Sequence, residues 1–154
     1  MPSVPLWERD PMTSAILQPL AVLLGWTCIM WVWMYAKRIP AITGLPKGVA
    51  PESDTGWSPG TLDAILPPRI QWIAHNYNHL HEQPTLFYAV ALALAVIGQG
   101  DGLNATLAWA YVVLRIIHSI FQSTVNKVPV RFGIFVLASL PLFALILHLI
   151  LAVF

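Results

Sequence analysis

Ionisable and amide side chains are concentrated where the second long apolar stretch of this chain begins. The run from His75 to Pro84 reads His-Asn-Tyr-Asn-His-Leu-His-Glu-Gln-Pro and leads directly into the apolar segment 85–97. Imidazole, carboxylate and amide groups transfer protons, hold charged ligands or bind metal ions. Such groups are costly inside a bilayer, so within a membrane segment they mark a site. The run therefore predicts a functional site where the chain enters the membrane.

A second set of polar side chains follows in and just after the segment 103–124. At about 100° per residue, the polar residues of each segment fall on one helix face about 100° wide. Antiparallel neighbours joined by a short turn bring such faces together, so we expect the two faces to line one polar cleft. The faces comprise His75, Asn78, His79 and Glu82 in the first segment, and Arg115, His118, Ser119, Gln122 and Asn126 in the second.

The two formal charges in these faces, Glu82 and Arg115, predict an ion pair. Both residues lie deep in apolar segments and at comparable depth. A charge without a partner is heavily penalised in that environment. We therefore expect the two side chains to meet.

Two other interpretations of the polar faces remain open. Polar side chains between membrane helices also act only as interhelical hydrogen bonds, worth about 1 kcal/mol each, and an ion pair can hold a bundle together without chemistry. His75 and His79 are four residues apart, with Glu82 one turn further on, which is a spacing found in helical metal sites. A single His-x-x-x-His is common, however, and we expect no metal ion here.

The elements that must position these residues are membrane helices. Hydrophobic residues make up 57% of the chain and charged residues only 10%, against about 25% charged residues in a soluble domain. At 1.5 Å per residue, about 20 apolar residues cross the hydrocarbon layer. The sequence predicts an all-α integral membrane protein, a four-transmembrane-helix bundle that forms one domain over residues 1–154. The expected helices span roughly 15–37, 69–98, 103–124 and 131–153, with a polar loop over 38–68.

The positions of the basic residues predict the orientation. Most of them lie in or beside the first and third loops, whereas the middle turn carries only an acidic residue, Asp101. Since loops rich in Lys and Arg stay in the cytoplasm, we expect loops one and three to be cytoplasmic and both termini to lie outside. No run of basic residues indicates nucleic-acid binding. The basic residues of the two loops are Lys37, Arg38, Lys47, Arg69, Lys127 and Arg131.

These features together resemble a known family. The four-span layout, the Asn-rich run followed by Glu and Pro, and the pattern Arg115-x-x-His118 followed by Val128-Pro129-Val130-Arg131 are similar to the MAPEG family, the membrane-associated proteins in eicosanoid and glutathione metabolism. Its prostaglandin-synthase branch has Arg-x-x-His and then Pro-x-Arg at the same separations. The resemblance covers residues 69–154 in detail and the first helix by position.

The resemblance implies a homotrimer that binds glutathione between protomers, in the cytoplasm-facing half of the membrane. The thiol would be added to, or would reduce or isomerise, a lipophilic small molecule arriving from the membrane lipid. As a divergent member of bacterial type, the protein is expected in the inner (plasma) membrane. Arg131 and Arg115 would act as electrostatic stabilisers and His75 or His118 as a proton carrier. The expected glutathione-binding residues are Asn78, Glu82, His75, His79, Gln122, Arg69 and Arg38.

The chain also departs from the family pattern. Gln71 and Ala74 stand where catalytic members usually have arginines, Gln122 stands in place of a tyrosine, and Phe132 in place of a serine; the family's Asn-x-x-Glu becomes Asn78-x-x-His81. Two hypotheses follow. The chain is a glutathione-dependent transferase or peroxidase, or it is a non-catalytic trimeric membrane protein that binds a lipid or a partner membrane protein.

Overall fold

The computed structural model describes residues 14–49 and 59–154, and this part of the chain is helical, without strands. Residues 1–13 and 50–58, which belong to the expected domain 1–154 and in part to the expected loop 38–68, lie outside the described residues. The helices are α1 (Leu17–Thr43), α2 (Pro59–Ile65), α3 (Pro68–His79), α4 (Gln83–Val96), α5 (Leu103–Thr124) and α6 (Val128–Val153).

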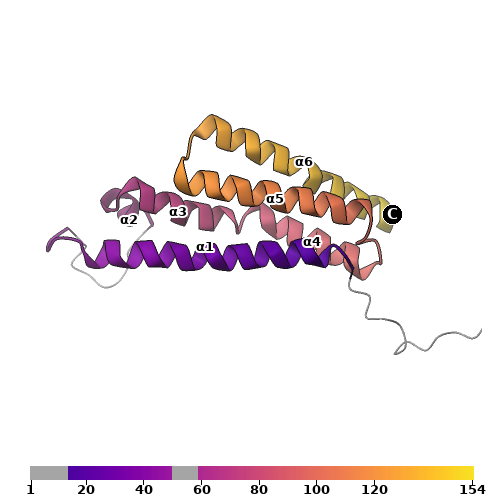
Figure 1. Cartoon of the computed structure of the whole chain (residues 1–154), viewed down its shortest axis with the longest axis horizontal. Coiled ribbons are helices and arrows are strands. Elements are labelled where there is room, and N and C mark those ends of the chain that lie inside the picture. Colours follow the sequence, from indigo (N-terminus) through magenta and orange to yellow (C-terminus); the bar gives the residue numbers. More distant parts are fainter. Residues whose placement is uncertain (1–13, 50–58) are drawn as a thin grey trace, which may run out of the picture.

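Three of these helices, α1, α5 and α6, are long and apolar enough to cross a membrane. Their outward faces carry exposed apolar side chains, among them Ile29 on α1, Ile117 on α5 and Phe143 on α6. A helix that is apolar on its outer as well as its inner side is typical of a membrane span. Figure 1 shows these helices side by side in an elongated bundle, with α3 and α4 following one another along it.

The helix expected over 69–98 is broken into α3 and α4. α3 ends at His79 and α4 begins at Gln83, with Glu82 between them at φ −93° and ψ −101°, outside the helical region. Pro84 explains the break, because it has no backbone N–H and its ring clashes with the carbonyl of the residue four positions earlier. Thr85 closes the first turn of α4 by donating both its N–H and its hydroxyl to the Glu82 carbonyl, at 3.2 and 2.6 Å.

Other helix boundaries differ less from the sequence expectation. α1 continues to Thr43 instead of ending near residue 37, and it contains Pro40 in its last turns. α6 begins at Val128 instead of 131, with a proline in its first turn, where the missing N–H costs no helical hydrogen bond. α5 has the expected bounds, 103–124. Within the polar loop, α2 forms a short helix.

The apolar core lies where α1, α4, α5 and α6 meet. Leu23, Phe87, Tyr111 and Leu142 are fully buried in it. The rings of Phe87 and Tyr111 stack with their centroids 4.7 Å apart, a geometry that adds about 1 kcal/mol to the burial of the two side chains. α3 packs on α1 and α5 beyond this core, so the polar end of the bundle is built mainly from α3, α5 and the start of α6.

The turn between α4 and α5 fastens the start of α1. The Ile16 N–H donates to the Gly100 carbonyl at 3.0 Å, and the Ala15 N–H donates to Asp101 Oδ1 at 2.7 Å. Gly100 is buried, and a Cβ at this position would collide with Ser14 Oγ and lie 2.7 Å from Ile16 Cγ2. Glycine is required here by space, and the turn and the helix start form one packed unit.

We predict that Gly100→Ala lowers the free energy of unfolding by about 1–3 kcal/mol, because the added methyl group overpacks this contact. The measurement is a denaturing-detergent titration followed by circular dichroism. Gly25→Ala is the matched control, since a Cβ at Gly25 meets nothing within 4 Å and alanine favours helix by about 1 kcal/mol. An equal or larger loss in the control would contradict the packing argument.

Candidate functional site

Arg115 closes the break between α3 and α4. Its Nη2 donates to the backbone carbonyl of His79 at 3.0 Å, and the residue is only 1% exposed. The last carbonyls of a helix have no partner within the helix and carry partial negative charge. The guanidinium therefore takes the place of the backbone donor that the break removes.

The expected ion pair between Glu82 and Arg115 is not formed. The Glu82 carboxylate instead accepts a hydrogen bond from His79 Nδ1 at 2.6 Å and is 65% exposed. The prediction was wrong because it continued the helical phase of α3 through residues 80–82. These residues leave the helix, which turns Glu82 away from α5.

A compact cluster of side chains surrounds the contact between Arg115 and His79. The His79 ring lies 5.3 Å from the ring of His118 and 5.4 Å from that of Phe135, and Arg115 Cζ lies 5.8 Å from the Phe135 ring centroid. These four residues, from α3, α5 and α6, are called the Arg115 cluster below. The sequence expectation missed Phe135, although it stands one helical turn after Arg131 and so shares its face.

Several buried polar atoms of this region have no hydrogen-bond partner among the described residues. They include Nε and Nη1 of Arg115, Nδ1 of His118 and Oε1 of Gln122. All three residues are buried on one face of α5, as the sequence periodicity predicted. Buried polar groups are hydrogen-bonded as a rule, so Arg115, His118 and Gln122 present donors and acceptors to a ligand or to water.

A second polar contact ties α1, α3 and α5 together. Ser119 Oγ accepts hydrogen bonds from Trp26 Nε1 at 2.9 Å and from Asn76 Nδ2 at 2.6 Å. Ser119 and Asn76 are both fully buried. Beside it, Gln83 Nε2 donates to Ser139 Oγ at 2.8 Å and joins α4 to α6. These are interhelical hydrogen bonds of the structural kind considered from the sequence.

The remaining candidate residues are not members of the Arg115 cluster, although Arg131 lies one helical turn before Phe135 on α6. His75 pairs with Asp63 at 3.2 Å, Asn78 is exposed, and Arg131 Nη1 donates to Asn126 Oδ1 at 2.7 Å. Arg38 is half-buried near the end of α1, and Arg69 lines a separate pocket with Lys37. Of the four polar residues expected on one face of the helix 69–98, only His79 therefore contacts the buried face of α5.

Metal ligation finds no support in the described residues. Among them, His, Cys, Asp and Glu side chains nowhere gather in a group of three or more that could hold a metal ion. His79 is engaged by Glu82 and His75 by Asp63, so the two imidazoles have different partners.

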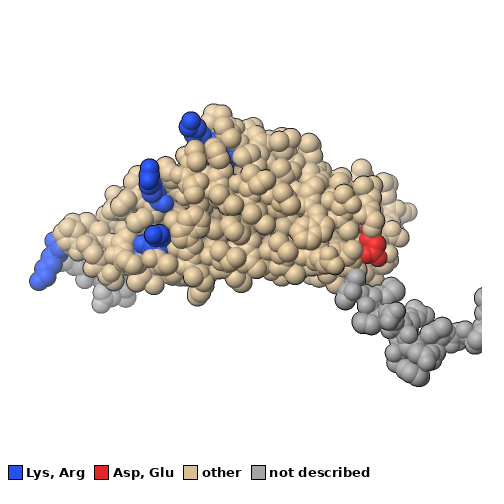
Figure 2. All heavy atoms as spheres, in the orientation of Figure 1, with Lys and Arg blue, Asp and Glu red and all other residues tan. Residues whose placement is uncertain are grey.

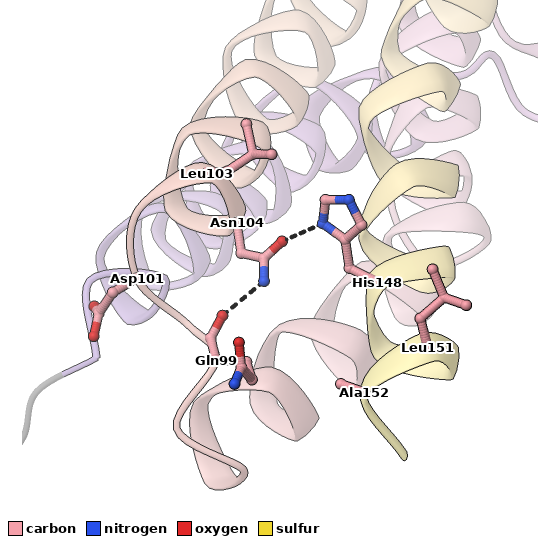
Figure 3. A pocket seen from close by; sticks show the side chains of 7 residues that line it. All are labelled: Gln99, Asp101, Leu103, Asn104, His148, Leu151 and Ala152. Carbon is pink, nitrogen blue, oxygen red and sulfur yellow. Dashed lines mark hydrogen bonds between the residues drawn. The ribbon is translucent and has the colours of Figure 1, made fainter. Parts of the chain in front are cut away.

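His148 lies at the opposite end of the bundle, in a pocket of about 560 Å³ formed by the ends of α5 and α6 (Figure 3). Asn104 Nδ2 donates to the Gln99 carbonyl at 2.7 Å, so its Oδ1 accepts from His148 Nδ1 at 2.6 Å. The imidazole thus carries its proton on Nδ1.

A family model described as the MAPEG family matches residues 16–151 of the chain. The match includes the Arg115 cluster and both polar faces. Comparison with curated proteins and with solved structures gave no match.

We predict that Arg115 and Glu82 differ sharply in their effect on stability. Arg115→Gln should lower the free energy of unfolding by about 1–3 kcal/mol, because the His79 carbonyl loses its donor. Glu82→Gln should change it by less than about 1 kcal/mol, as for other exposed charge pairs. Unfolding of both single variants and of the double variant in detergent tests this. If the two single variants lost equal stability and the double variant lost less than their sum, a direct ion pair would be indicated instead.

We also predict that Ser119→Ala destabilises the protein by about 1–3 kcal/mol, since it leaves the Trp26 and Asn76 donors buried without an acceptor. Thr106→Ala is the control on the same helix, because Thr106 is exposed and its hydroxyl bonds only to the Gly102 carbonyl, at 3.1 Å. Tryptophan fluorescence should change with Ser119→Ala and not with the control. An unchanged unfolding curve for Ser119→Ala would contradict the prediction.

Proposed function

The chain belongs to the MAPEG family, and on this premise we propose that it is a glutathione-dependent transferase or peroxidase acting on lipophilic electrophiles in the membrane. The observation that carries the proposal is Arg115, a fully buried cation whose Nε and Nη1 have no hydrogen-bond partner among the described residues. A preorganised cation in a site that excludes water stabilises developing negative charge much better than an exposed one.

We propose that α3 and α4 together make the fourth membrane crossing. Their 12 and 14 residues give a length of about 39 Å at 1.5 Å per residue, enough for a hydrocarbon layer of about 30 Å. His75, Asn78 and Glu82 are exposed on this pair, and polar side chains on a membrane span avoid lipid. A homotrimer that buries this surface between protomers accounts for their exposure in one protomer.

The described residues match the chemistry of glutathione, which has two carboxylates, an ammonium group and a thiol. Arg115 and Arg131 are suited to its anionic groups, and the Glu82 carboxylate and the Asn78 amide to its ammonium and peptide groups. Gln122 offers an amide oxygen without a protein partner. When bound, glutathione supplies a nucleophilic sulfur, and a nearby cation favours the thiolate form.

His118 is the residue best placed to move a proton. Its Nδ1 is buried and has no partner among the described residues, and its ring centroid lies 5.3 Å from that of His79 and 6.1 Å from that of Phe135. An imidazole in this position can take the thiol proton or protonate a leaving oxygen. We therefore assign His118 the acid–base role and Arg115 and Arg131 the stabilisation of charge. His79 positions Arg115 through its carbonyl and His118 through its ring.

One observation favours the second candidate, a non-catalytic trimer that binds a lipid or a partner membrane protein. Gln71, in place of a family arginine, uses its Nε2 to hold the carbonyls of Asp63 and Leu66, at 2.5 and 2.6 Å. Ala74, in place of the other, is buried in one apolar cluster with Met30 and Met34 of α1. Two positions that serve ligand binding in catalytic members therefore serve packing here.

Purified protein in nanodiscs, titrated with glutathione by calorimetry and assayed with chlorodinitrobenzene and a lipid hydroperoxide, distinguishes the candidates. We expect turnover, and a decrease in kcat of about 100-fold or more for His118→Gln, the usual range for loss of an acid–base group. Arg131→Gln should weaken glutathione binding, whereas Lys127→Gln, an exposed cation at the same helix start, should not. Absence of both binding and turnover in the intact protein would favour the non-catalytic candidate.

A further inference from the structure

The end of the bundle that holds α2 and α3 carries most of the described basic side chains. Figure 2 shows lysine and arginine gathered toward this end and an acidic group at the opposite one. A pocket of about 380 Å³ opens there between α1, α3 and α5. It is lined by Trp33, Lys37, Arg69, Ile70, Ile73, Ser123 and Thr124, and is called the α1–α3–α5 pocket below.

The polar groups of this pocket suit an anion. Lys37 and Arg69 are exposed, and neither has a hydrogen-bond or ion-pair partner among the described residues; none of the described lining residues is acidic. Ser123 is only 5% exposed, yet its buried hydroxyl has no partner there. Two unpaired cations and an unsatisfied buried hydroxyl are a donor set for phosphate, which arginine binds with two parallel hydrogen bonds.

The apolar groups of the pocket indicate that the phosphate belongs to a lipid. The side chains of Trp33 and Ile70 are half-buried and that of Ile73 is buried, so they form an apolar wall beside the cations. Lys37 stands 20 residues after the first residue of α1, or about 30 Å along the helix, which equals the thickness of the hydrocarbon layer. The two cations are thus at headgroup level, where tryptophan is also favoured.

We propose that the α1–α3–α5 pocket binds the phosphate headgroup of an anionic phospholipid. Lys37 and Arg69 contact the phosphate, Ser123 donates its hydroxyl to it, and the apolar wall contacts the glycerol and the first acyl methylenes. Basic pockets between membrane helices on the cytoplasmic side recognise headgroups in this way. The pocket is separate from the Arg115 cluster: Arg69 precedes His79 by ten residues, about 15 Å along α3. The proposal does not depend on catalysis.

The test uses full-length protein in detergent and native mass spectrometry, with four probes: dioctanoyl phosphatidylglycerol, dioctanoyl phosphatidylcholine, inorganic phosphate and glutathione. We expect phosphatidylglycerol to bind at least about tenfold more tightly than phosphatidylcholine, and millimolar phosphate not to displace it. The double variant Lys37→Gln, Arg69→Gln should weaken phosphatidylglycerol binding by about tenfold or more. Ser123→Ala, which keeps both charges, should weaken it several-fold.

The matched control is the double variant Lys47→Gln, Lys127→Gln, which removes two exposed lysines outside the pocket. It should retain the affinity of the intact protein within about twofold, since the loss of charge is equal and the pocket is untouched. An equal loss in the control would overturn the proposal in favour of unspecific attraction. Displacement of the lipid by inorganic phosphate would overturn it in favour of a free-phosphate site, and displacement by glutathione would assign the pocket to glutathione.

Discussion

The hydrogen bond from Arg115 to the His79 carbonyl connects the fold of this protein to its candidate site. Pro84 breaks the helix between α3 and α4, so the His79 carbonyl loses its donor within the helix, and in lipid every backbone polar group needs an internal partner. Arg115 supplies that partner with one of its five N–H groups. The guanidinium is thereby fixed beside His118 with other N–H groups still free, so the break in the helix positions the cation.

No carboxylate among the described residues bonds to Arg115, since the Glu82 carboxylate bonds to His79 instead. The groups that face it are the C-terminal carbonyl of α3, the Phe135 ring and the His79 and His118 imidazoles. Carbonyl dipoles and an aromatic face offset part of the cost of a buried cation, but less than an opposite charge does. An anionic ligand at this point would complete the balance, which is why the Arg115 cluster carries the functional proposal.

The sequence predicted one of the two polar faces and failed on the other for a definite reason. On α5 the helix is continuous, so a phase of 100° per residue correctly places Arg115, His118 and Gln122 on one buried face. Between α3 and α4 the phase is reset, and Glu82 turns outward. The proline that causes the reset was visible in the sequence. Which group satisfies the freed carbonyl was not, because that contact joins residues 36 positions apart, and pattern alone does not give such contacts.

The buried cation Arg115 and the exposed cations Lys37 and Arg69 lie in different dielectric surroundings. They can therefore serve different functions. Arg115 is buried among apolar and aromatic groups, where the interaction of two charges is several times stronger than in water. Lys37 and Arg69 are exposed on the surface of the bundle, where water and salt screen them. A buried cation can alter the reactivity of a bound group, because its field acts at short range and without reorganisation. Exposed cations instead affect how often a ligand binds and in which orientation it is held. On the proposals made above, chemistry belongs to the buried Arg115 cluster, and recognition of the membrane belongs to the exposed basic end of the bundle.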